Sequence, residues 1–480
     1  MKRFVHYIYC NTKFSNMLRV ILLIAFFANS FCLSAQHKVT FKVHYSELYA
    51  TYDFITKIGP GYPDNDLKTI FEKSFYNTAA ARKMIEDFSQ IRIDYNYPFG
   101  QYPSPLKVGF MSRDFLEKNL ATSQSIEGFK EKSAGIIPNE DLIAFSKTLD
   151  IFTSIYRELV FEPNKAAFTQ QKNSLQEYVD NNKFADFFAK GLIFYDVIWD
   201  AGLPFDICLL PSYEKGNLGA RAFINVAICE PPINLKDLTS FFSVAMHEIY
   251  HILYDNQSLS LKNDIAKWFS ATRSPNSQYA LLLLNEVLAT GLGNGYLMEK
   301  INGKIDKEDW YANKYIAGMA KETYALLKKY VEEEKPIDEA FVRSYVKTYD
   351  TKFGDWSKEL AHLFTYRYIM STDQGDIAYF RKNFRFYSNN RTGSPVSQQE
   401  IDRAKEMPVT KVLVISSRHK EVYAMAKNSF EELKNFTPDL TKEFIRIFTL
   451  NDHTKLFIIN RHRSSVEALM NKYFPDKIIK

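Results

Sequence analysis

The sequence predicts an α+β protein that is mostly helical, with a small sheet and one very apolar helix at its centre and a small α/β domain at its C-terminus. Three observations support this prediction. Apolar residues recur at helical spacing through most of residues 37–200 and 301–405, a run rich in β-branched residues precedes an apolar helix in 201–300, and strands alternate with helices after residue 406. The predicted division is 1–35, 36–200, 201–300, 301–405 and 406–480.

Residues 1–35 are typical of a secretory signal peptide. Arg19 precedes the apolar residues 20–28, and Leu33-Ser34-Ala35 forms a small-residue cleavage site before Gln36. The apolar run is short for a membrane-spanning helix, although an uncleaved anchor remains an alternative. We therefore expect a secreted or periplasmic protein without stable membrane insertion after cleavage.

The charge of the mature chain argues against a nucleic-acid partner. Four cationic residues and no acidic residue leave with the leader, so the formal net charge of +5 falls to +1. A nearly neutral chain has no electrostatic reason to bind a polyanion.

The region 37–200 is predicted to open with a short strand at 38–45 and to continue as helices over 66–75, 79–91, 113–120, 139–161 and 174–199. Its aromatic residues favour core packing over a ligand site. We expect this region to form one wall of a cleft.

Two strands are predicted at 205–210 and 222–228; the first contains Cys208, and Cys229 directly follows the second. If the strands form a hairpin, Cys208 and Cys229 can lie opposite each other and form a disulfide in an oxidising compartment. Two buried free thiols are the alternative.

An apolar helix follows, with Asn234 as its predicted N-cap and its end near Tyr254. It contains the pattern His247-Glu248-Ile249-Tyr250-His251, in which the two histidines are four residues apart and therefore share one helix face. Burial of unpaired polar groups costs several kcal/mol. A metal ion held by both imidazoles, with Glu248 beside it, would satisfy all three side chains. Two core histidines bonded to backbone carbonyls are the alternative.

A second helix is predicted to begin at Ser277 and to end at Gly291. Glu286 is the one acidic residue in its apolar run, which makes Glu286 the natural third metal ligand. A partly exposed helix glutamate is the alternative.

The pattern His247-Glu248-x-x-His251 followed by Asn285-Glu286-x-x-Ala289 resembles the gluzincin zinc metallopeptidases, the group that contains thermolysin. The resemblance implies a zincin-like catalytic core with Zn²⁺ bound by His247, His251 and Glu286. It also implies Glu248 as general base and an upstream edge strand, here 222–228, that binds a peptide or protein substrate.

The chain departs from that family in two places. The gap between His251 and Glu286 is longer than in thermolysin, and Thr290 stands where the family has a carboxylate that orients a ligand histidine. A backbone carbonyl or Asp255 is expected to take that orienting role.

Residues 301–405 are predicted to be helical over 309–330, 337–349 and 356–370, with a loop at 389–393. His362, Tyr366 and Tyr368 lie in the third segment, and the two tyrosines are candidates for stabilising an oxyanion, with core packing as the alternative. After residue 406 the sequence predicts strands at 411–416, 444–450 and 456–460 and helices at 420–434 and 464–473. His419, His453 and His462 occur there without ligand spacing and are predicted at the surface.

The sequence thus predicts a secreted or periplasmic zinc-dependent peptidase. Two alternatives remain open, namely an envelope binding or scaffold protein with a vestigial zinc site, and a zinc hydrolase of a non-peptide bond.

Overall fold

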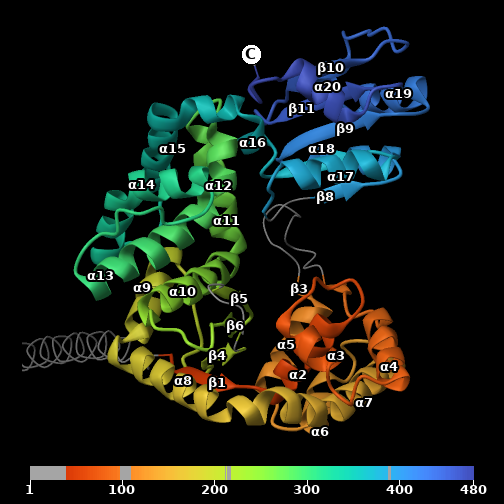
Figure 1. Cartoon of the computed structure of the whole chain (residues 1–480). Helices are drawn as coiled ribbons and strands as arrows, with labels where there is room; N and C mark the ends of the chain where they lie inside the picture. The colour runs from red at the N-terminus through yellow and green to blue at the C-terminus, as the bar shows by residue number, and fades with distance from the viewer. Residues whose placement is uncertain (1–38, 98–109, 211, 213–217, 388–390, 480) are drawn as a thin grey trace, which may run out of the picture.

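The computed structural model describes residues 39–97, 110–210, 212, 218–387 and 391–479, and the predicted leader lies outside this range. The described chain is mostly helical and holds a four-stranded, a five-stranded and a two-stranded sheet (Figure 1). The predicted combination of helices and small sheets is confirmed at this level. Within the described residues, no helix combines the length and the hydropathy of a membrane-spanning segment.

The four-stranded sheet has the order β1-β4-β6-β5. Its first three strands are parallel, and β5 runs antiparallel to β6 as an edge strand. The strands are β1 (Phe41–Tyr45), β4 (Phe205–Leu209), β5 (Gly219–Phe223) and β6 (Val226–Glu230). The prediction of one continuous strand over 222–228 is wrong. The range spans the end of β5 and the start of β6, and Ile224 and Asn225 form a two-residue turn between them. Ile224 has a φ of 58° there, a conformation that β-branched residues rarely adopt.

Helices cover both faces of this sheet (Figure 1). One face packs against a lobe that we call the N-terminal lobe, and the other packs against α10 and its neighbours. The N-terminal lobe consists of α2 (Glu47–Ile58), α3 (Asp66–Glu72), α4 (Ala79–Gln90), α5 (Ser112–Thr122), α6 (Ile126–Ser133) and α7 (Asn139–Tyr156). From α7 the chain runs through the π-helical η1 (Arg157–Phe161), α8 (Glu162–Asn181) and α9 (Phe184–Tyr195) to the other side.

The two cysteines lie on opposite faces of the sheet. Cys208 packs into the core of the N-terminal lobe and Cys229 into the core around α10. Their strands are parallel neighbours, and Cys229 pairs with Leu209, one position away from Cys208. Since successive side chains of a strand point to opposite faces, no disulfide forms, and both are buried free thiols.

The helices that follow form the largest core. Their bounds are α10 (Leu238–Asp255), α11 (Leu259–Ala271), α12 (Ser277–Thr290), π-helical η2 (Gly291–Leu297), α13 (Met298–Asn302), α14 (Lys314–Glu332) and α15 (Glu339–Phe353). Asp237, not Asn234, caps α10 by accepting a hydrogen bond from the Ser240 backbone N–H. The second α-helix ends at Thr290 with Gly291 as its C-cap, as predicted. The chain does not leave the helical path there, however, because it continues as η2 and turns only at Gly303, with a φ of 70°.

The five-stranded sheet, ordered β10-β11-β9-β7-β8, lies at the C-terminal end of the chain (Figure 1). Its strands are β7 (Arg367–Met370), β8 (Arg391–Gly393), β9 (Thr410–Ile415), β10 (Phe444–Thr449) and β11 (Lys455–Asn460), and its helices are α17 (Gln374–Asn383), α18 (Gln398–Glu406), α19 (His419–Ser429) and α20 (Val466–Tyr473). The sheet thus takes β7 and β8 from the predicted region 301–405. The predicted helix 356–370 is wrong. This segment forms a 3₁₀ turn (η3, Gly354–Lys358), a short helix (α16, Leu360–Leu363) and β7. The strand was not recognised in the sequence because a strand buried on both faces has no alternation of apolar and polar residues.

Candidate metal centre

Helix α10 brings His247 and His251 together on one face. Their Nε2 atoms lie 3.1 Å apart. The Nδ1 atoms point away from this contact. Nδ1 of His247 lies 3.2 Å from Asn294 Oδ1, and Nδ1 of His251 lies 2.9 Å from Asn285 Oδ1. The structure therefore places both imidazoles as the sequence predicts, with an amide oxygen behind each ring.

The hydrogen bonds behind the rings fix where the protons lie. An amide oxygen only accepts, so Nδ1 of each imidazole carries the proton and donates it. In the neutral imidazole Nε2 then holds a lone pair, and the two lone pairs face each other across 3.1 Å. This arrangement repels unless a cation or a proton lies between the two nitrogens.

Glu286 on α12 completes a triangle with the two imidazoles. Its Oε2 atom lies 3.6 Å from Nε2 of His247 and 3.6 Å from Nε2 of His251, and it is buried without a hydrogen-bond partner. A tetrahedral zinc ion with ligands at about 2.0–2.2 Å separates them by about 3.4 Å. The three atoms therefore fit three corners of such a site.

Burial and charge oppose each other at Glu286. Burial raises the pKa of this carboxyl, and the neighbouring His247 and His251 lower it by more, so the pKa lies below its ordinary value. Glu286 is thus an anion beside two imidazoles, and a carboxylate with two imidazoles is a donor set that suits a divalent metal ion.

Glu248 lies beside the triangle. A carboxylate oxygen of Glu248 and a ring nitrogen from each of His247 and His251 lie within 4.8 Å of one another, close enough to hold a metal ion together. Burial raises the pKa of Glu248 to about 7, with Glu286 adding to the rise and His251 opposing it.

Asn294 was missed by the sequence reasoning, as was the role of Asn285. Asn294 lies in η2, beyond the glycine at which the helix was predicted to end. The predicted acceptors, a backbone carbonyl or Asp255, are not the ones used, because asparagine amides occupy both positions. A continuous helix past Gly291 would have placed Asn294 near the site.

Gly293 allows η2 to lie directly against the α10 backbone. A Cβ atom at this position would come within 2.9 Å of Ser243 O and 3.0 Å of both His247 Cα and His247 N. We expect Gly293→Ala to destabilise the protein by about 1–3 kcal/mol, as overpacking does, and to weaken metal binding by displacing His247. Thermal unfolding and zinc titration measure both effects.

Gly128→Ala in α6 is the matched control, since its nearest neighbour is a serine hydroxyl at 3.5 Å. This control should be neutral or slightly stabilising. A Gly293→Ala protein with wild-type unfolding and wild-type zinc affinity would contradict the tight packing of η2 on α10.

The Asn294 amide is expected to matter for metal affinity. Loss of a group that orients a ligand histidine typically weakens metal binding about 10–100-fold, so Asn294→Ala should show a loss of this size in a competition titration with a zinc chelator. Asn294→Asp should restore the affinity, since a carboxylate also accepts from Nδ1. Asn383→Ala, an exposed residue whose side chain donates to Tyr379 O of its own helix, should bind zinc as the wild type does.

A tyrosine cluster lies next to the centre. Tyr311 stacks on His247, with ring centroids 5.4 Å apart, and it interacts electrostatically with Glu286. Tyr387 lies beside Tyr311, with centroids 6.1 Å apart. The Tyr366 hydroxyl is buried without a hydrogen-bond partner and interacts electrostatically with Glu286.

The other candidates from the same region lie elsewhere. Tyr368 donates to Glu400 Oε2 at 2.6 Å. His362 is fully buried, its Nε2 lies 2.7 Å from the Tyr349 hydroxyl, and burial lowers its pKa to about 3. Among the predicted surface histidines, His453 and His462 are exposed, whereas His419 is half-buried and stacks on His462 with ring centroids 4.1 Å apart.

Comparison with protein-family models, with curated proteins and with solved structures finds no match to this chain.

Proposed function

We propose that the protein is a zinc-dependent peptidase whose metal is held by His247, His251 and Glu286. The observation that carries the proposal is the triangle of Nε2, Nε2 and Oε2 atoms, in which two lone pairs and a buried, unpartnered carboxylate oxygen converge. A metal ion satisfies all three. Three protein ligands with a free fourth corner are typical of catalytic zinc, whereas structural zinc has four protein ligands.

In the proposed hydrolysis, different residues have different roles. When bound, Zn²⁺ would polarise the scissile carbonyl and lower the pKa of the attacking water. Glu248 takes the proton of that water and delivers it to the leaving amine. The Tyr366 hydroxyl, buried and without a partner, is the group best suited to donate a hydrogen bond to the oxyanion.

Strand β5 is the proposed binding edge for the substrate backbone, in place of the predicted 222–228. In a two-residue hairpin the residues next to the turn exchange both hydrogen bonds, and every second residue does so after them. Phe223, Arg221 and Gly219 therefore bond to β6, and the N–H and C=O groups of Ala220 and Ala222 point to the open edge. An extended peptide can add there as a further strand.

Two alternative functions make different predictions from those of a peptidase. In a binding or scaffold protein with a vestigial site, metal binds without turnover. In a hydrolase of a non-peptide bond, the same residues act on a different carbonyl or phosphoryl group. Neither has a separate observation in its favour, whereas the open edge of β5 beside the centre favours a peptide.

Digestion of a peptide library by the purified mature protein, with and without chelator, tests the proposal. We expect cleavage that stops when the chelator removes the metal and returns when Zn²⁺ is restored. Absence of cleavage in a zinc-loaded protein would favour the binding-protein alternative.

Export stays a prediction from the sequence. We expect the secreted form to begin at or near Gln36, because the apolar run at 20–28 is short and Ala35 is a small residue at the cleavage position. N-terminal sequencing of the secreted protein checks this. Recovery of an intact leader in the membrane fraction would show an anchor instead.

A further inference from the structure

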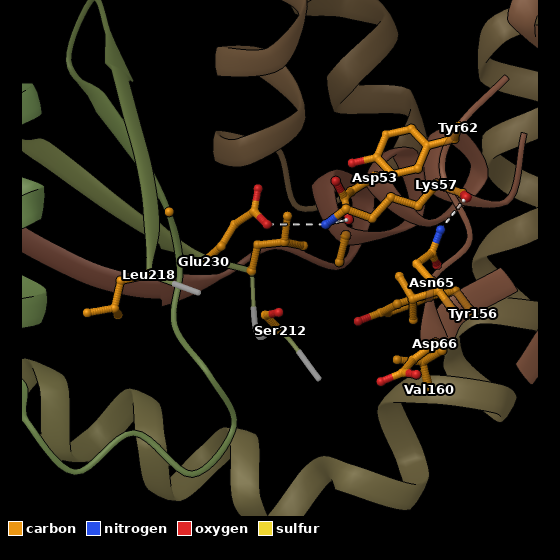
Figure 2. A pocket seen from close by; sticks show the side chains of 14 residues that line it. Asp53, Lys57, Tyr62, Asn65, Asp66, Tyr156, Val160, Ser212, Leu218 and Glu230 are labelled. Carbon is orange, nitrogen blue, oxygen red and sulfur yellow. Dashed lines mark hydrogen bonds and ion pairs between the residues drawn. The ribbon is translucent and has the colours of Figure 1, made fainter. Parts of the chain in front are cut away.

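A second feature of the molecule lies between the N-terminal lobe and the sheet. It is a cavity of about 370 Å³, bounded by α2 and α3 on one side and by the start of β5 and the end of β6 on the other (Figure 2). This volume is at the lower end of the range of about 300–1,000 Å³ for ligand pockets. The proposed chemistry does not use it.

The charged groups of this cavity are mostly acidic. Among the described lining residues, Asp53, Asp66 and Glu230 carry negative charge and only Lys57 carries positive charge, which leaves an excess of two negative charges in this part of the chain. Lys57 Nζ lies 2.9 Å from Asp53 Oδ2 and 3.2 Å from Glu230 Oε2, and Figure 2 shows Lys57 and Glu230 reaching toward each other from helix and sheet. Glu230 is 39% exposed, so its carboxylate can accept from a second cation as well.

The remaining lining suits a long aliphatic stem. Ala50, Leu67, Leu210 and Leu218 contribute apolar surface. The side chains of lysine and arginine place an apolar stem along such a surface and keep the charged head at polar groups. An acidic rim with an apolar wall therefore fits a basic side chain.

The cavity adjoins the metal centre through the edge strand. Gly219, which lines the cavity, pairs with Glu230, and the next pair along is Ala220 with Cys229. Helix α10, which carries His247, Glu248 and His251, packs against β5. Cavity and centre thus flank neighbouring positions of β5, on opposite faces of the sheet, because Cys229 and Glu230 point to opposite faces.

We infer that this cavity is a subsite for a lysine or arginine side chain of a peptide extended along β5, an inference that rests on the proposed peptidase function. An extended peptide rises about 3.3 Å per residue and turns alternate side chains to opposite faces. A peptide whose scissile bond lies at the metal therefore presents a side chain within about two residues of that bond to the cavity. Glu230 is the residue that determines this specificity.

The test compares peptides that differ only in charge at that position. A positional library should show lysine and arginine enriched at one position near the cleaved bond. For the best sequence with arginine there, kcat/KM in Glu230→Gln should fall roughly tenfold, the size expected for one hydrogen bond to a charged group. For the same peptide with citrulline, which has the same shape and no charge, Glu230→Gln should cleave as the wild type does.

Asp64→Asn is the matched control variant, because Asp64 lies between α2 and α3 beside the lining residue Asn65, is fully exposed and does not line the cavity. It should leave the ratio of arginine to citrulline cleavage unchanged. Glu230→Lys should invert the preference toward glutamate at the same position. Equal cleavage of the arginine and citrulline peptides by the wild-type protein would overturn the subsite and leave the peptidase proposal standing.

A binding measurement separates the two proposals. In the full chain carrying Glu248→Gln, acetyl-arginine amide should bind about tenfold more tightly than acetyl-citrulline amide, and adding Glu230→Gln should remove the difference. If no peptide is cleaved by the zinc-loaded wild type, the peptidase proposal fails and this titration decides the subsite alone. Equal binding of the two amides would overturn the subsite.

Discussion

The Glu248→Gln variant is expected to keep its fold and its zinc and to lose peptide hydrolysis almost completely. Glutamine has nearly the shape of glutamate and can hydrogen-bond the attacking water, but it cannot take the proton. General-base assistance contributes about 10²–10⁴-fold in rate, and Glu248 would also deliver the proton to the leaving amine, so the loss should lie at the upper end. Steady-state cleavage and metal analysis of the same preparation measure both quantities.

Two results would contradict this role. Equal cleavage by Glu248→Gln and by the wild type would show that Glu248 is not the base. A large loss of zinc from the variant would show that Glu248 is a fourth ligand and the site is closed, as in a structural zinc site. Glu332→Gln is the control for a change from glutamate to glutamine away from the site, because Glu332 is exposed and pairs with Lys300. This variant should keep the activity and the zinc of the wild type.

The Glu286→Ala variant is expected to lose zinc and, with it, activity. Removing a metal ligand should weaken binding by more than the 10–100-fold typical of orienting groups. The zinc contribution to stability should disappear too. A metal at a hundred times its Kd stabilises the folded state by about 2.7 kcal/mol, so chelator should lower the Tm of the wild type and leave that of Glu286→Ala nearly unchanged.

Glu322→Ala, on the exposed side of α14, serves as a comparison and should respond to chelator as the wild type does. Full-strength zinc binding by Glu286→Ala would mean that the third ligand lies elsewhere. His247→Ala should behave like Glu286→Ala, which distinguishes the ligand residues from Glu248, whose substitution leaves the protein inactive but loaded with zinc.

The site helix could be predicted from sequence because several local signals agree there. Residues 241–254 are apolar on nearly every side, and the only strongly polar group among them is His247-Glu248-x-x-His251. The third carboxylate also followed from local context, since Glu286 is the one charge in an apolar run. The structure brings these side chains together, and their chemical roles stay predictions.

The parts that could not be predicted depend on tertiary contacts. Glycine normally favours the end of a helix, but the backbone of Gly291 stays helical, packed against Leu327 of α14, and the chain continues as η2. Ile224 takes a left-handed conformation that its own preference disfavours, so the hairpin turn is imposed by the pairing of β5 with β6. Strand β7 is buried on both faces and carries no period that separates it from a buried helix.

Whether Cys208 and Cys229 form a disulfide depends on the order of the strands in the sheet, which the sequence does not reveal. A hairpin between the two strands would have placed them opposite each other, whereas β4 and β6 are parallel neighbours. The strand that forms a hairpin with β6 is β5, which lies between β4 and β6 in the sequence. The relation between the two thiols follows from the strand order, which no local signal contains.

The π-helical segment η2 makes the position of the Asn294 amide behind His247 depend on how the helix is wound. A π-helical turn contains one residue more than the α-helical turn it replaces, and each residue of an α-helix advances the side-chain direction by about 100°. If the same residues formed a regular α-helix, the side-chain directions along the segment would shift by up to about that angle, and the Asn294 amide would turn away from His247. The hydrogen bond behind the His247 ring therefore depends on the winding of a neighbouring helix as well as on the residue types.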